Sequence, residues 1–253
     1  MKKNILITND DSIFAEGIKR LENGVKGFGS VYTVAPDREK SAVSFGITTN
    51  SPLRINKVDD YHYAVSGTPV DCVYLATKVL LKEKPNLVIS GINHGPNVGE
   101  DTIYSGTVAG AFQASLLGIQ AIAISVIDND SGKYDFDSAV KVLRKLIPFL
   151  LDNPLPEGNI LSINVPYSPK GVKLTKLGHK RYDAEVIEKQ DPKGNKYYWI
   201  GPGKITTFGE NESDVKAVEN DFVSITPLSL NFFDNNLYKT LKKRENEIFK
   251  KMV

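Results

Sequence analysis

The feature that most constrains the fold is the alternation of short apolar, β-branched runs with amphipathic helical stretches through the first two thirds of the 253-residue chain. This alternation is typical of βαβ units that wind a parallel sheet, whose strands are nearly continuously apolar because both faces are buried. The expected strands are 4–8, 31–35, 86–90, 121–126 and 160–165, and the expected helices are 15–25, 70–81, 105–117 and 135–151. The sequence therefore predicts an α/β fold, a parallel sheet flanked by helices.

Two stretches depart from this rhythm. Residues 47–66 and 171–205 are rich in Tyr, Val, Thr and Lys and contain turn signals, so we expect antiparallel hairpins that project from the sheet. Aromatic residues concentrate in the segment KYYWI at 196–200, which indicates either an interface or groove wall, or a hairpin buried within the monomer. The tail at 237–251 predicts a basic amphipathic helix, either solvated or packed on a partner.

Composition excludes several classes of partner and site. Lys and Arg total 32 against 30 for Asp and Glu, and this net charge of +2 favours neither nucleic acid nor an anionic membrane as partner. The single cysteine, Cys72, excludes an internal disulfide and favours a reducing, cytoplasmic location. With three histidines, a metal site has to rely mostly on oxygen ligands, which points away from zinc. The longest uncharged run, 102–127, is too polar for a membrane span.

The first strand ends in the sequence TNDDS at 8–12. Ligands of open α/β sheets bind beyond the carboxyl ends of the strands, so function is expected here. Asp10 and Asp11 can converge on one ion only where the chain leaves the extended conformation, and two close carboxylates repel unless a cation or a shared proton compensates them. The pair indicates a divalent metal site or, alternatively, one aspartate that caps the next helix beside a solvated one.

A loop rich in glycine and asparagine follows the strand 86–90. Residues 90–99 contain three glycines and two asparagines, which let backbone amides approach an anion and offer neutral oxygen ligands to a hard cation. The next helix opens with Ser105, Gly106 and Thr107, whose free amides and hydroxyls can cradle a phosphate. Alone, such a start is usually only a cap, and the Gly-Lys-Ser/Thr ending of a Walker A loop is absent.

Two further loops contain weaker signals. The charged loop APDREKSA at 35–42 includes Ser41, whose hydroxyl is a weak ligand that matters only where carboxylates already hold an ion. In the segment SGTPVDC at 66–72, Pro69 after Thr68 predicts the start of a helix and a structural role.

Five motifs follow one another along the chain. They are ITNDD at 7–11, APD at 35–37 with Ser41, SGTP at 66–69 with DC at 71–72, SGIN at 90–93 with Gly95 and Asn97, and SGT at 105–107. Together they resemble the motifs of the SurE family, the survival-protein E nucleotidases. The resemblance extends over nearly the whole chain, to DP at 191–192 with YYW at 197–199 and to VSITP at 223–227.

The resemblance implies an architecture and an assembly. It implies a Rossmann-like domain with an appended β-hairpin region and a C-terminal helical arm that exchanges between subunits, giving a homodimer or homotetramer. We accordingly expect one SurE-like domain over 1–253, with a Rossmann-like core at 1–167 and a hairpin and oligomerisation arm at 168–253.

The resemblance also implies a chemistry: a cytoplasmic, metal-dependent phosphatase that hydrolyses nucleoside monophosphates, a 5′-nucleotidase with 3′-nucleotidase and exopolyphosphatase activity as further options. One divalent cation per subunit, Mg²⁺ or Mn²⁺, would be held by Asp10, Asp11, Ser41 and Asn93. Phosphate contacts would fall on Asn97, Ser105, Gly106 and Thr107. The expected catalytic residues are Asp10, Asp11 and Asn97, with Asp10 favoured over Asp11 as base and with His94 either an acid for the leaving group or a loop residue that lines the mouth.

Two other functions compete with this one. A covalent aspartyl-phosphate phosphatase would use Asp10 as nucleophile, but such enzymes place two aspartates two residues apart, and here they are adjacent. A nucleotide-binding regulator without turnover is the other, because a Rossmann-like sheet alone does not prove catalysis. The chain also departs from the family in having Ser12 where glycine usually follows the aspartate pair. If that position requires a positive φ, the serine costs about 1 kcal/mol or more.

Overall fold

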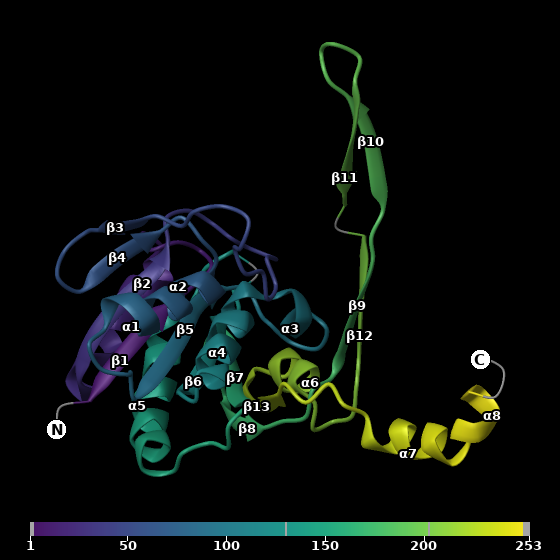
Figure 1. Ribbon diagram of the computed structural model, residues 1–253. Coiled ribbons are helices and arrows are strands. Elements are labelled where there is room, and N and C mark those ends of the chain that lie inside the picture. The colour runs from purple at the N-terminus through teal and green to yellow at the C-terminus, as the bar shows by residue number, and fades with distance from the viewer. Residues whose placement is uncertain (1–2, 130, 202, 250–253) are drawn as a thin grey trace.

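A nine-stranded mixed sheet forms the body of the computed structural model, which describes residues 3–129, 131–201 and 203–249 (Figure 1). Five neighbouring strands are parallel and confirm the predicted strands, although the third continues past Ser90. They are β2 (Ser30–Pro36), β1 (Asn4–Thr8), β5 (Leu87–His94), β6 (Gln120–Val126) and β7 (Asn159–Val165), in spatial order.

Each edge of the sheet gains two more strands. β3 (Ile55–Lys57) and β4 (His62–Val65) form an antiparallel hairpin, but β4 pairs in parallel with β2. The prediction that this hairpin projects is therefore wrong, because its turn signals do not reveal the pairing with a distant strand. At the other edge β13 (Phe222–Ser229) runs antiparallel to β7, and β8 (Gly171–Leu174) runs parallel to β13. The sheet thus takes strands from both sides of residue 167.

Helices cover both faces of the sheet. The predicted helices appear as α1 (Glu16–Val25), α2 (Pro69–Leu75), α4 (Gly106–Leu116) and α5 (Phe136–Asp152). The turn η1 (Lys26–Phe28) follows α1, and a π-helical turn, η2 (Ala76–Leu80), follows α2. Contacts pair α1 with α5 on one face and α2 with α4 on the other.

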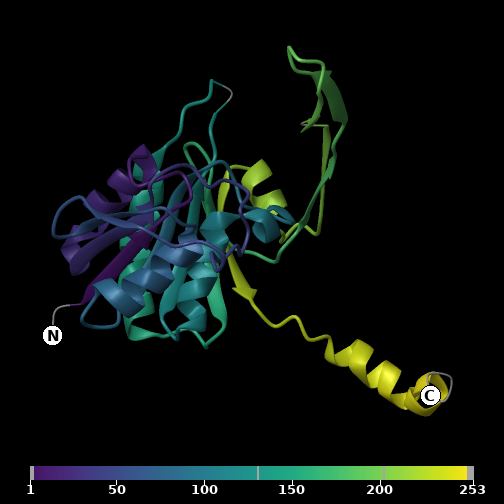
Figure 2. The same ribbon diagram turned by 45° about the horizontal axis from the view of Figure 1, so that its top comes forward.

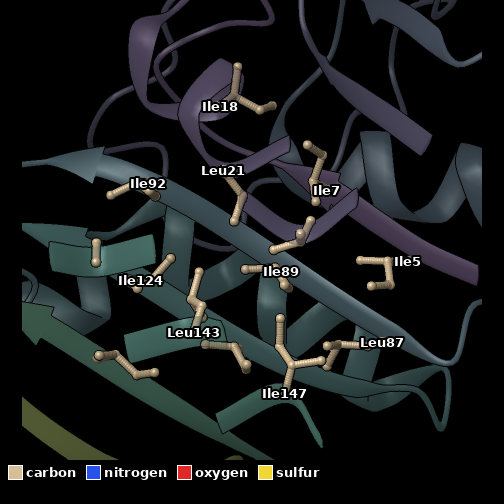
Figure 3. Packing of buried hydrophobic residues seen from close by; sticks show 14 of the residues in the cluster. Ile5, Ile7, Ile18, Leu21, Leu87, Ile89, Ile92, Ile124, Leu143 and Ile147 are labelled. Atoms are coloured by element: carbon tan, nitrogen blue, oxygen red, sulfur yellow. The ribbon is translucent and has the colours of Figure 1, made fainter. Parts of the chain in front are cut away.

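Successive residues of β1 enter opposite cores. Ile5 and Ile7 pack in the cluster beneath α1 and α5, where Figure 3 shows them with Leu143 of α5, whereas Leu6 belongs to the cluster beneath α2 and α4. This is the twofold alternation of a strand that is buried on both faces. Burial on both faces fixes the register of β1, and with it the place where the chain leaves the sheet at Thr8.

A long hairpin and a helical tail extend away from the body (Figures 1 and 2). We call residues 179–208 the arm; in it β9 pairs with β12 near the body and β10 pairs with β11 further out. Every residue of β11 is exposed, so the alternative of a hairpin buried within the monomer is wrong. The strands are β9 (His179–Asp183), β10 (Val186–Gln190), β11 (Lys196–Ile200) and β12 (Lys204–Phe208).

The remaining helices are α3 (Asp101–Tyr104), α6 (Asp214–Glu219), α7 (Asn235–Lys243) and α8 (Glu245–Phe249). The last two form the predicted helical tail, whose final residues, 250 and 251, lie outside the described part of the chain. In the part that is described, no helix has the length and apolar character needed to cross a membrane.

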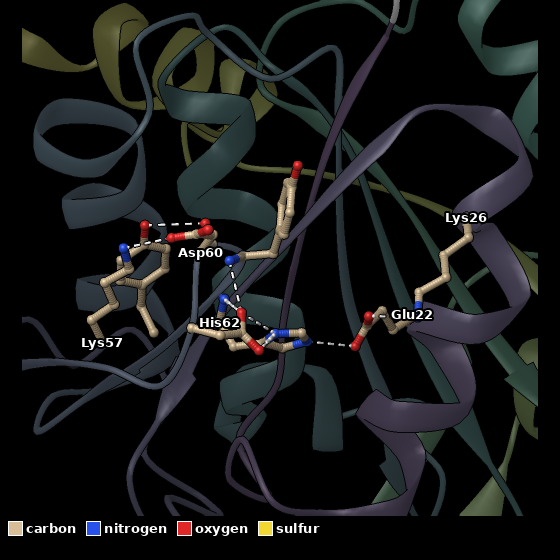
Figure 4. Close-up of polar contacts among 8 residues, drawn as sticks. Glu22, Lys26, Lys57, Asp60 and His62 are labelled. Carbon is tan, nitrogen blue, oxygen red and sulfur yellow. Dashed lines mark hydrogen bonds and ion pairs between the residues drawn. The ribbon is translucent and has the colours of Figure 1, made fainter.

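A charged cluster ties the β3–β4 hairpin to α1 (Figure 4). His62 Nε2 lies 2.8 Å from Glu22 Oε2, and His62 Nδ1 lies 2.7 Å from Asp59 Oδ1. Both ring nitrogens can donate only in the imidazolium form. Burial lowers the pKa of His62, but the two carboxylates outweigh burial and raise that pKa above its usual value of 6.5.

We expect the stability that His62 contributes to depend on pH. Since the pKa is higher in the folded than in the unfolded state, the contribution is complete below about pH 6.5 and is lost as the pH rises through the folded-state pKa. Urea denaturation of the wild type and of His62→Gln should therefore give free energies of unfolding that differ most at acidic pH and converge at alkaline pH. A difference independent of pH would contradict this account.

Candidate active site

A pocket of about 250 Å³ lies beyond the carboxyl ends of β1, β2 and β5. Its lining includes five of the residues predicted from the sequence, Asp10, Ser41, Asn93, Asn97 and Ser105. The other three lie beside it. Thr107 is hydrogen-bonded to Asp10, Gly106 packs against the same carboxylate, and Asp11 lies against His94, which lines the pocket. The structure thus brings all eight predicted residues together.

Asp10 joins the end of β1 to the start of α4. Its side chain is almost fully buried; the Thr107 amide donates to Oδ2 at 3.1 Å, and the Thr107 hydroxyl donates to Oδ1. Burial raises the pKa of Asp10 to about 6; the Thr107 bonds oppose this rise, and the charge of Asp11 adds to it. The alternative of an aspartate cap on the next helix is wrong, because the N-cap of α1 is Ala15, without a side-chain cap.

Asp11 has a buried oxygen without a hydrogen-bond partner. Its Oδ2 lies 3.2 Å from His94 Nδ1, close enough for an ion pair but not aligned as a hydrogen bond. The His94 ring is held edge-on by Tyr134 and Phe136, with centroids 4.9 and 5.4 Å away. Interaction with Asp11 raises the pKa of His94. A buried carboxylate oxygen that accepts no hydrogen bond is costly, and binding a cation would remove that cost.

Asn93 and Ser41 are the neutral oxygen donors at the pocket. Asn93 Nδ2 donates to the Gly95 carbonyl at 2.8 Å, which leaves the side-chain carbonyl as the free end of the amide. The Ser41 hydroxyl is exposed and donates to Glu39 at 2.8 Å. The described residues contain no group of three or more His, Cys, Asp or Glu that could hold a metal ion. A cation here would therefore depend on two carboxylates with amide and hydroxyl oxygens, a donor set that fits a hard ion.

Asn97 is held rigidly from the sheet. The backbone N–H of Asn97 donates to Asn164 Oδ1 at 2.7 Å, and Asn164 Nδ2 donates back to the backbone carbonyl of Asn97 at 3.2 Å. The side-chain Nδ2 of Asn97 donates to Ser125 Oγ at 2.9 Å. All three residues are buried. Sequence reasoning missed Ser125 and Asn164, although a polar residue within the apolar strands β6 and β7 was an available signal.

The first turn of α4 serves the helix and Asp10 at once. Ser105 Oγ accepts from the Val108 amide at 3.0 Å, so the serine is the helix cap. A side chain on Gly106 would place its Cβ 2.9 Å from Asp10 Oδ2, so glycine allows the helix to approach the carboxylate. The phosphate contacts expected of these residues stay a prediction.

Residues of the arm complete the pocket. Lys180 and Tyr182 of β9 line it, together with Asp101 and Tyr104 of α3. Sequence reasoning missed them because charged and aromatic residues in a hairpin give no local indication of which distant loop they contact.

Ser12 adopts the strained backbone that the missing glycine implies. Its φ is +97°, in a region that favours glycine, and Asn9 Nδ2 holds its carbonyl at 2.8 Å. The loop after the aspartate pair is therefore kept in place at a cost in backbone strain.

Ser12→Gly should raise the free energy of unfolding by about 1 kcal/mol, since relief of strain exceeds the added entropy of the unfolded chain. Ser51→Gly is the matched control, at an exposed loop position outside the left-handed region, and should be neutral or slightly destabilising. Urea denaturation of the three proteins measures both effects. Equal destabilisation by the two substitutions would contradict strain at Ser12.

Comparisons with known proteins agree with this geometry. A family model described as survival protein SurE matches residues 5–184. A protein of Myxococcus xanthus named 5′-nucleotidase SurE is 44% identical over 237 residues, covering 92% of this chain and 90% of its own. A protein of the same name from Pelobacter propionicus is 44% identical over 231 residues, covering 90% and 93%. The crystal structure of the SurE protein from Aquifex aeolicus matches with a TM-score of 0.82 and 38% identity, covering 96% of this chain and 99% of that one. The chain therefore belongs to the SurE family.

Proposed function

We infer that the protein is a 5′-nucleotidase, a phosphatase that hydrolyses nucleoside monophosphates to nucleoside and phosphate. Relatives named 5′-nucleotidase SurE match it over nearly their whole length. The observation that carries the inference is the adjacent pair Asp10 and Asp11: Asp10 is buried and lines the pocket with Asn97 and Ser105, and Asp11 is partly buried beside it. The aspartyl-phosphate alternative gains no support, because the two aspartates are adjacent and not two residues apart.

We propose one divalent ion per subunit, Mg²⁺ or Mn²⁺, with Asp10, Asp11, Ser41 and Asn93 as its ligands. The donor set supports this, as does the buried Oδ2 of Asp11, which lies 3.2 Å from His94 Nδ1 but accepts no aligned hydrogen bond. When bound, such an ion polarises a phosphoryl oxygen and lowers the pKa of a water molecule.

Residues of the chain itself would hold the phosphoryl group and transfer protons to and from the reacting groups. Asn97, with Ser105, Gly106 and Thr107, would hold the phosphoryl oxygens as charge spreads over them. Of the two aspartates, Asp10 is the proposed proton acceptor, because it lines the pocket beside the start of α4, which is proposed to hold the phosphoryl group. His94 lines the pocket and has a raised pKa, as an acid for the leaving alkoxide requires.

We also propose a cytoplasmic location, which the free and buried Cys72 supports.

We further propose a homodimer or homotetramer that forms through the arm and the C-terminal helices. Trp199 and Ile200 at the outer part of the arm are 61% and 83% exposed, and Leu237 and Leu241 of α7 are about half exposed. An isolated two-stranded hairpin is marginally stable in water, so burial against another subunit would stabilise it.

Purified protein should release phosphate from adenosine or guanosine monophosphate with Mn²⁺ or Mg²⁺, and EDTA should abolish the release. Asp10→Asn should lower the rate by about a hundredfold or more, because it removes a charged ligand and the proposed base. Asp221→Asn, which breaks an exposed ion pair with Lys170, is the control and should retain the wild-type rate. Metal-dependent nucleotide binding without phosphate release would favour the regulator instead, and a borohydride-reducible adduct on Asp10 would favour the covalent phosphatase.

Introducing charge on the outer arm should dissociate the assembly. The double variant Trp199→Glu with Ile200→Glu is expected to show a lower mass by light scattering than the wild type, because two apolar side chains that the proposed interface would bury would become charged. Lys193→Glu, at the exposed turn between β10 and β11, changes charge without removing apolar surface and should keep the wild-type mass. A wild type that is monomeric at micromolar concentration would contradict the proposal.

A further inference from the structure

One wall of the active-site pocket comes from the arm. Lys180 of β9 lines the pocket with Asp10, Asn97 and Ser105, although it lies far from them in the chain. Only 14% of its side chain is exposed, so the ammonium group is placed between the arm and the body. A lysine this buried requires partners, because burying an unpaired charge is costly.

Helix α3 supplies those partners. Lys180 Nζ lies 2.7 Å from Asp101 Oδ2, and the Tyr182 hydroxyl donates to Asp101 Oδ1 at 2.6 Å. Glu100 fixes the start of β9, since its Oε1 lies 2.8 Å from His179 Nδ1 and its Oε2 accepts from the Lys180 amide at 2.5 Å. Burial lowers the pKa of Lys180, but Asp101 and Tyr182 outweigh burial and raise it, so the side chain is charged at neutral pH.

The charges around the pocket show what this ammonium group can bind. Asp10 and Asp101 line the pocket and Asp11 is adjacent to Asp10, so the surroundings are acidic apart from Lys180 and His94. The phosphoryl group is the only charged part of a nucleoside monophosphate. Lysine binds phosphate in many proteins through its positive charge. Its ammonium group has three N–H donors, and the contact with one carboxylate oxygen leaves donors free for a phosphoryl oxygen.

We propose that Lys180 is a substrate-binding residue that contacts the phosphoryl group, and that Asp101 and Tyr182 are positioning residues that hold its ammonium group at the pocket. The proposal rests on the proposed nucleotidase function for its substrate. It assigns the arm a part in the active site besides its part in assembly.

The test compares Lys180→Met with Lys180→Arg and with the control Lys176→Met. Lys176 lies shortly before β9 in the chain and pairs with Glu210 and Glu212, but it does not line the pocket. Calorimetric titration with inorganic phosphate in the presence of Mn²⁺ measures affinity without turnover, and initial rates with a nucleoside monophosphate give KM and kcat. Lys180→Met should weaken phosphate binding and raise KM by about tenfold or more, whereas Lys180→Arg should stay within about threefold of the wild type. Lys176→Met should leave both unchanged.

A second pair of variants separates a lost ligand from a displaced arm. Glu100→Gln removes the charge beside His179 but keeps an acceptor for the Lys180 amide and leaves the contact of the ammonium group with Asp101, so phosphate affinity should stay near that of the wild type. Asp101→Asn keeps an acceptor for Tyr182 and removes the charge that orients Lys180, so it should raise KM more than it lowers kcat. Should Lys180→Met fail to fold, Lys180→Gln is expected to weaken phosphate binding in the same way.

Three results would overturn the proposal: no phosphate binding by the wild type, an effect of Lys180→Met no larger than that of Lys176→Met, or an equal effect of Glu100→Gln. The measurements distinguish failure of the Lys180 assignment from failure of the nucleotidase function. Binding of phosphate through Lys180 in a protein that releases none from any nucleoside monophosphate would refute the nucleotidase function and leave the assignment of Lys180 standing. Release of phosphate with unchanged affinity in Lys180→Met would do the reverse.

Discussion

The hydrogen bonds between Asp10 and Thr107 fix the geometry of the active-site end of the sheet. They join the last residues of β1 to the first turn of α4, and they require the helix to approach so closely that Gly106 has no room for a side chain beside Asp10. They offset only part of the cost of burying the carboxylate, since the pKa of Asp10 stays raised. Because part of this cost remains, a positive charge next to Asp10 would stabilise the carboxylate. This carboxylate lies where the carboxyl ends of the parallel strands meet.

A second buried carboxylate links this pocket to the arm. Asp214, at the start of α6, accepts from the Gly99 amide at 3.0 Å and from the Gly178 amide at 2.6 Å. The loop that contains Asn97 is thereby held between the sheet on one side and the base of the arm on the other. One buried carboxylate therefore joins the base of the arm to the loop that is proposed to contact phosphate.

The sequence was informative where one local pattern determines the outcome. Apolar β-branched runs predicted the parallel strands, and polar residues that directly follow these strands predicted the pocket, because burial and chain direction are encoded within a few residues. The pairing of β4 with β2, the addition of β13 and β8 to the sheet, and the arrival of Lys180 at the pocket all depend on contacts between distant segments. A hairpin lysine has the same local sequence character whether it lies in solvent or against Asp101, so composition and periodicity cannot identify it.

The net charge of +2 is a poor guide to what this protein binds, because the relevant charges are local. Asp10 and Asp11 repel each other across a short distance, and at about 4 Å two such charges interact by about 4 kcal/mol at an effective dielectric constant of 20. A phosphate dianion entering that field alone would be repelled as well. A divalent cation held by the two aspartates, as proposed, would reverse the sign of the local field, and Lys180 would add a positive charge from the arm. On these proposals, the cation and the arm would together attract a doubly charged phosphoryl group to the pocket.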